Sequence, residues 1–155
     1  MGNKGGLRAF VATIEEKAQS CNDDRSGRRQ FVSELGSLCA GIHSDNMWRH
    51  PIRFLREMQG NPPRQFGTAG FHPEVVDDAN PARHYMAFVV VGFWLPKILA
   101  IPVLYLWEIA SFFRYKGHWS QKDIHSGMIG IRHGRAVASE GVQVLAPLAR
   151  RDLAV

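Results

Sequence analysis

The residue best placed for chemistry in this sequence is His84, which stands at the entrance to a long apolar run. It follows Asn80 and Pro81, a pair typical of the cap and first position of a helix, so His84 falls in the first helical turn. The positive end of the helix dipole disfavours a charged imidazolium there. A neutral His84 is suited to act as a general base or a ligand, with Asp77 or Asp78 orienting it. The favoured interpretation is a structural histidine at the edge of the core, hydrogen-bonded to the preceding loop.

Glu108 is the second candidate, because it is a carboxylate within an otherwise uncharged segment. If the helix predicted over 97–113 packs antiparallel to the one over 81–95, Glu108 approaches His84 and forms an acid/base pair with it. The alternatives are a salt bridge to a neighbouring basic residue or exposure to water. The candidate catalytic residues are therefore His84, Glu108 and Asp78.

Known catalytic and metal-binding motifs are missing from the sequence. It contains no H-E-x-x-H, C-x-x-C, G-x-S-x-G or Walker spacing. The side chains of His72, Asp77, Asp78 and His84 lie within thirteen residues and could share a metal ion, but nothing in their spacing requires one. We predict neither a metal nor a cofactor.

The elements that must position these residues are helical. Apolar residues recur at helical spacing over residues 7–21 and 28–42, and a short third helix is predicted over 51–58. The segment 60–80 is rich in Pro and Gly and is predicted to be a long structured loop between an N-terminal helical half and an apolar helix pair. The length of 155 residues suits one domain, covering 1–155.

The apolar pair is predicted over about 81–95 and 97–113, divided at Pro96. Ser120 and Asp123 have the spacing of a capping box and open a last helix that runs to residue 140. For the tail after it, the sequence leaves a short strand and an extended arm as alternatives. The predicted fold class is all-α, a compact bundle of five or six helices around the apolar pair.

A membrane segment over residues 85–113 is the main alternative to a buried helix pair. The 19 residues from Ala87 to Tyr105 average roughly 1.9 in hydropathy, within the range of membrane spans. Against this, Lys97 lies inside that window, where a charge costs about 2.5–3.5 kcal/mol on insertion scales. The amphipathic N-terminal helices also need an apolar partner. We favour a buried pair.

Small residues mark one face of the last helix. Gly127, Gly130 and Gly134 are three and four residues apart and so line one side of it. Such a face allows another helix to approach closely, and Gly92 is the predicted matching contact.

Composition narrows the function classes without selecting one. The net charge of +5 comes from short, scattered basic clusters, which makes nucleic acid an unlikely partner. Cys21 and Cys39 fit no redox or metal spacing and are predicted to be free thiols of a cytoplasmic protein, with membrane association as the alternative localisation. The leading hypothesis is a helical protein that binds a protein partner or assembles with itself. The alternatives are a membrane-associated protein using 85–113, and a hydrolase or toxin-like effector with His84 as general base.

Overall fold

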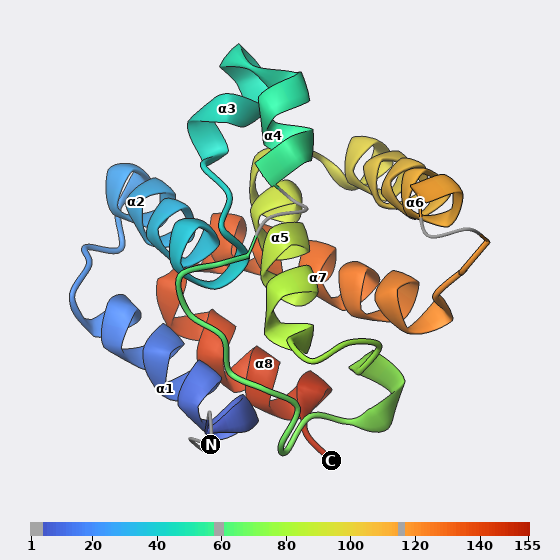
Figure 1. The fold of residues 1–155 in the computed structure, drawn as a ribbon. Helices are drawn as coiled ribbons and strands as arrows, with labels where there is room; N and C mark the ends of the chain where they lie inside the picture. Colours follow the sequence, from blue (N-terminus) through green and yellow to red (C-terminus); the bar gives the residue numbers. More distant parts are fainter. Residues whose placement is uncertain (1–4, 58–60, 115–116) are drawn as a thin grey trace.

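The computed structural model describes residues 5–57, 61–114 and 117–155, and these form an all-helical domain without strands (Figure 1). Eight α-helices are joined by a π-helical turn at Gly36–Ala40 and by 3₁₀ turns at Pro73–Val75 and Val142–Val144. The α-helices are α1 (Gly6–Gln19), α2 (Arg25–Leu35), α3 (Ser44–Arg49), α4 (Pro51–Glu57), α5 (Pro81–Trp94), α6 (Lys97–Arg114), α7 (Gln121–Glu140) and α8 (Leu145–Leu153). The all-α prediction is confirmed, and the described residues hold more helices than the five or six expected.

Helix α5 runs through the centre of the domain (Figure 1). Every residue from Tyr85 to Gly92 is buried, and the π-helical turn at Gly36–Ala40, α2 and the Phe10 ring of α1 pack against the helix. Pro81 starts the helix as predicted, but the side chain of Asn80 does not cap it. The Asn80 Oδ1 instead accepts a 3.5 Å bond from the Phe66 amide, and thereby fastens the preceding loop to the start of α5.

The main partner of α5 is α7, and this corrects the predicted central pair of 81–95 with 97–113. A Cβ atom at Gly130 would lie 2.6 Å from the Tyr85 carbonyl oxygen, and one at Gly92 would overlap the backbone of Ile131. The two backbones therefore touch where glycines face each other, which confirms the predicted close approach. No comparable stripe of small residues runs along α6.

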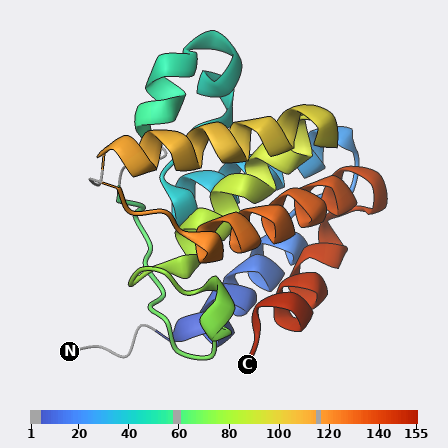
Figure 2. The same cartoon turned by 90° about the vertical axis from the view of Figure 1, so that its right-hand side faces the viewer.

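Helix α6 lies on the outside of the bundle, and Figure 2 shows it in front of α5. Its buried residues are Ala100, Leu104 and Glu108, a single stripe at a spacing of four. The segment 85–113, considered above as a membrane segment, forms two separate helices, because the helix is interrupted at Leu95 and Pro96. Among the described residues, no helix is both long and apolar enough to cross a bilayer.

The connecting segments differ in part from expectation. Residues 61–80 of the predicted loop contain one 3₁₀ turn. The loop also accepts hydrogen bonds from the first amides of α1: the Gly6 amide donates to the Phe66 carbonyl at 2.9 Å, and the Leu7 amide donates to the Ala69 carbonyl at 2.8 Å. Helix α3, which begins at Ser44, was not predicted from the sequence. The helix predicted over 51–58 is α4, with Met58 outside the described residues.

The C-terminal tail is a helix, which overturns both alternatives drawn from the sequence. Helix α8 packs against α1 and α7, and the tail's contact with the loop is reduced to one bridge between Phe71 and Ala154. The buried residues of α8 repeat at helical spacing and are Leu145, Ala146, Ala149 and Leu153. A short amphipathic stretch of this kind needs a core to pack on, and α1 and α7 provide it.

Candidate functional site

His84 is held in one orientation by a backbone carbonyl of another helix. Its Nε2 lies 2.7 Å from the Asp123 carbonyl oxygen at the start of α7. A carbonyl only accepts, so Nε2 carries the proton and Nδ1 keeps a free lone pair. The ring also packs on Phe88, with centroids 5.0 Å apart. Burial lowers the pKa of His84 below its ordinary value, so the neutral imidazole predicted from its helical position is also favoured by its surroundings.

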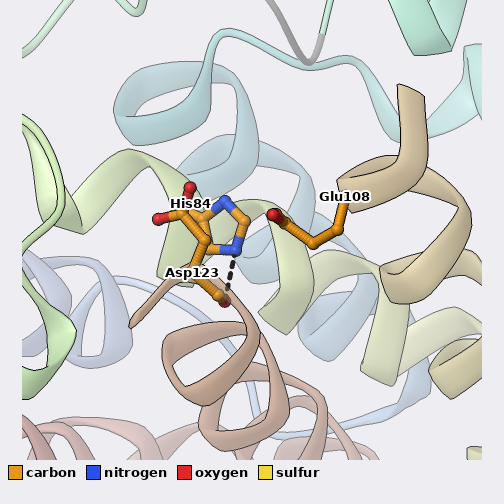
Figure 3. Close-up of side chains that lie close together, drawn as sticks. All are labelled: His84, Glu108 and Asp123. Atoms are coloured by element: carbon orange, nitrogen blue, oxygen red, sulfur yellow. Dashed lines mark hydrogen bonds between the residues drawn. The ribbon is translucent and has the colours of Figure 1, made fainter. Parts of the chain in front are cut away.

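Glu108 is the least solvent-exposed carboxylate of the described chain. It is only 1% exposed, and it projects from the buried stripe of α6 toward His84 (Figure 3). The Ser120 amide donates to its carboxylate, whereas Oε1 has no hydrogen-bond partner among the described residues. Burial, with the nearby charges of Asp123 and Asp77, raises the pKa of Glu108 to about 7. Both protonation states of this carboxyl are therefore populated near neutral pH.

Asp123 is the third member of the cluster, and sequence reasoning missed it. The sequence indicated only its capping spacing, and the Ser120 Oγ does accept a 3.1 Å bond from the Asp123 amide. In the folded chain one potential ligand atom each of His84, Glu108 and Asp123 lies within 4.8 Å of the others (Figure 3). Burial raises the pKa of the Asp123 carboxyl. We call these three residues the cluster.

Gly127 is the one feature of the sequence that could have indicated that His84 packs against the start of α7. It lies four residues after Asp123, on the same face of α7. A Cβ atom there would lie 2.5 Å from Leu104 Cδ1 and 3.3 Å from His84 Nε2. The missing side chain therefore leaves the space into which the imidazole ring fits.

The cluster opens into a pocket of about 330 Å³ between α5, α6 and α7. Asp78, the third predicted site residue, lines this pocket but does not belong to the cluster. It forms an ion pair with Arg83 at 3.3 Å and accepts a 2.7 Å bond from the Asn80 amide. The other polar lining residues outside the cluster are Asp77, His118, Ser111 and Ser120. His72, considered above as a metal ligand, does not line the pocket, and its Nδ1 accepts from the Glu74 amide.

The pocket is strongly acidic for its size. Four carboxylates line it, from Asp77, Asp78, Glu108 and Asp123, and the cation facing them is Arg83. Carboxylates so close together raise one another's pKa, as the coulombic effects on Glu108 and Asp123 show. Such a site is suited to proton transfer and to binding positive charge, and it is unsuited to anionic substrates.

A second polar network, also missed by sequence reasoning, lies away from the pocket. The Tyr85 hydroxyl is 2.8 Å from His133 Nδ1, and His133 Nε2 is 2.8 Å from Asp152 Oδ2. Tyr85 and His133 are fully buried, whereas Asp152 is partly exposed and also pairs with Arg132 and Arg151, so the network runs from the core to the surface. Sequence spacing could not reveal it, because Asp152 comes from a tail whose helix was not predicted.

Comparison with protein-family models, curated proteins and solved structures finds no match to this chain.

Proposed function

We propose that this protein is a hydrolase whose active site is the acidic pocket, with water activated at His84 and Glu108. One observation carries the proposal: the buried Glu108 carboxylate lies beside the His84 imidazole and has an oxygen without a partner among the described residues. An unpaired buried acceptor costs about 1–3 kcal/mol of stability. Such a cost is characteristic of a group kept for function.

The geometry supports a division of roles within the cluster. The neutral His84 has a lone pair on Nδ1, which activates a water molecule by taking its proton or by ligating a Lewis acid that binds the water. Glu108, with its pKa near 7, is suited to protonate a leaving group. The Asp123 carbonyl keeps the imidazole in the correct tautomer, as orienting groups do in other hydrolytic sites.

The charge of the pocket narrows the substrate class. Four carboxylates repel phosphorylated and other anionic substrates, so the proposed substrates are neutral or cationic esters, amides or glycosides. The apolar lining from Ala87 and Trp107 provides a surface for an uncharged substrate group.

Replacing His84 with alanine should lower hydrolysis by about 10²–10⁴-fold, because the activating lone pair is removed. The measurement is kcat/KM on a panel of neutral and cationic chromogenic substrates. The matched control is His125→Ala, which removes an exposed histidine from α7 and should leave kcat/KM unchanged. Circular dichroism of both variants shows whether the fold is retained. A folded His84→Ala protein with full activity would contradict the proposal.

A different observation favours a second candidate function, association with an anionic membrane surface. Helix α6 presents large apolar side chains to solvent, and we call this the α6 face: Ile98, Leu99, Tyr105, Leu106, Ile109 and Phe113. Helices α3 and α4 add exposed Trp48 and Ile52, together with basic residues at 49, 53 and 56. Apolar side chains beside basic ones are typical of peripheral membrane helices. Binding of a protein partner or of a second copy, the leading expectation from sequence, would use the same face.

Leu106→Glu should abolish co-sedimentation with vesicles containing phosphatidylserine, because it places a negative charge within the α6 face. Met128→Glu makes the same type of change at an exposed apolar residue of α7 and should leave binding intact. Equal binding by both variants, or none by the unaltered protein, argues against the membrane surface. Self-association would instead appear without vesicles, as a sedimentation coefficient that rises with concentration.

A further inference from the structure

The cluster has the donor set of a divalent metal site. It offers one imidazole nitrogen and two carboxylate oxygens, all within 4.8 Å of one another, from α5, α6 and α7. We propose that His84 Nδ1, Glu108 and Asp123 bind a first-row divalent cation of the Zn²⁺ type. This inference rests on the proposed hydrolase site and specifies how water would be activated there: the bound cation would activate the water, and Glu108 would be a ligand instead of the proton donor.

The hydrogen bond of His84 is the type that accompanies metal ligation. A ligating histidine generally donates its other ring N–H to a carboxylate or backbone carbonyl, which fixes the ring and raises the basicity of the ligating nitrogen. The 2.7 Å bond from Nε2 to the Asp123 carbonyl is such a contact. It leaves Nδ1 as the nitrogen available to a cation.

Glu108 provides an independent observation that points to a ligand. A buried carboxylate is normally paired with a cation or fully hydrogen-bonded. The Glu108 carboxylate accepts a hydrogen bond from the Ser120 amide. Its Oε1 atom has no hydrogen-bond partner in the described chain, although the residue is only 1% exposed. The cation that Arg83 contributes to the pocket pairs with Asp78 at 3.3 Å, so it is directed to a different carboxylate.

The ligand types select the class of cation. Imidazole nitrogen combined with carboxylate oxygens suits zinc and its first-row neighbours, whereas magnesium and calcium prefer oxygen ligands alone. Ligands about 2.1 Å from a tetrahedral ion stand roughly 3.4 Å apart, so the cluster has to close by rotation of the two carboxylate side chains. Three protein ligands leave a coordination position for water or substrate, which is the pattern of catalytic zinc sites.

Isothermal titration of the full-length protein, first dialysed against a chelator, tests the site with Zn²⁺, Mn²⁺ and Mg²⁺. We expect one Zn²⁺ per chain with micromolar or tighter affinity and much weaker binding of Mg²⁺. Glu108→Gln should weaken Zn²⁺ binding at least tenfold, because a charged ligand is lost. Asp77→Asn removes the same charge from the same pocket but no member of the cluster, and should change the affinity by less than about threefold.

The same variants keep the inference falsifiable. The metal-free Glu108→Gln protein should melt at the temperature of the unaltered protein or above it, which separates lost binding from lost fold. Absence of saturable Zn²⁺ binding, or equal weakening by Glu108→Gln and Asp77→Asn, overturns the metal site. Hydrolysis that persists in excess chelator overturns the role of the cation in activating water while leaving the hydrolase proposal standing. Tight Zn²⁺ binding that depends on Glu108, in a protein without hydrolytic activity, supports the metal site and contradicts the hydrolase.

Discussion

Replacing Gly134 with alanine should destabilise the protein by about 3 kcal/mol or more, because α5 and α7 can no longer pack at their present distance. A Cβ atom at this position would overlap the Val89 carbonyl oxygen and lie 2.7 Å from the Phe93 amide nitrogen. Both are backbone atoms of α5, and a helix backbone cannot move aside as a flexible side chain can. The whole of α7 would have to shift.

The sign of this effect makes the test discriminating. Alanine is favoured over glycine inside an isolated helix by about 1 kcal/mol, so propensity alone predicts that Gly134→Ala stabilises α7. Urea denaturation should show the opposite, a lower midpoint with little change in slope. His125→Ala, at an exposed position of the same helix, serves as the control and should shift stability by less than about 0.5 kcal/mol. A Gly134→Ala protein as stable as the unaltered one would show that the helices are not in backbone contact.

The glycine face also explains which part of the fold the sequence could predict. Hydropathy identified α5 and α6 as the apolar segments and led to the prediction that they form the central pair. It measures how apolar a segment is, whereas the distance of closest approach depends on side-chain size. Helix α7 is less apolar than α6 but packs closer to α5, because Gly130 and Gly134 face it. The glycine spacing was visible in the sequence and was the better guide to the partner of α5.

The candidate site was predictable only in part, for a related reason. His84 and Glu108 stood out because each is a titratable residue in an apolar context, and that signal is local. Asp123 joins them through the path of the chain between α6 and α7, which no spacing rule gives. Asp78 was expected beside His84 because it is near in sequence, but its carboxylate is engaged by Arg83 and the Asn80 amide. Sequence proximity therefore indicated the pocket and not the contacts within it.

The network that links the buried Tyr85 and His133 to Asp152 gives the second large prediction. Asp152 accepts a hydrogen bond from His133 Nε2, so the single ring proton of the neutral imidazole is on Nε2. Its Nδ1 then accepts a hydrogen bond from the Tyr85 hydroxyl. All hydrogen-bonding atoms of the imidazole are thus satisfied in the neutral form. Replacing His133 with glutamine should lower the free energy of unfolding at pH 7 by about 2 kcal/mol, because Tyr85 and Asp152 lose a partner whose geometry glutamine does not reproduce.

The pH dependence of this variant tests the neutral state directly. Burial lowers the pKa of His133 below its ordinary value, despite the opposing effect of Asp152. Below about pH 6.5 the unfolded chain therefore binds a proton at His133 that the folded chain does not. The free energy of unfolding therefore decreases as the pH is lowered. His133→Gln lacks this proton, so the stability difference between the two proteins should shrink as pH falls from 7 to 5, by at most about 1.4 kcal/mol per pH unit. Contributions from His84 and Glu108 are common to both proteins and cancel. Urea denaturation at four or five pH values measures the difference, and a gap that stays constant or widens toward pH 5 would mean that the buried imidazole is charged.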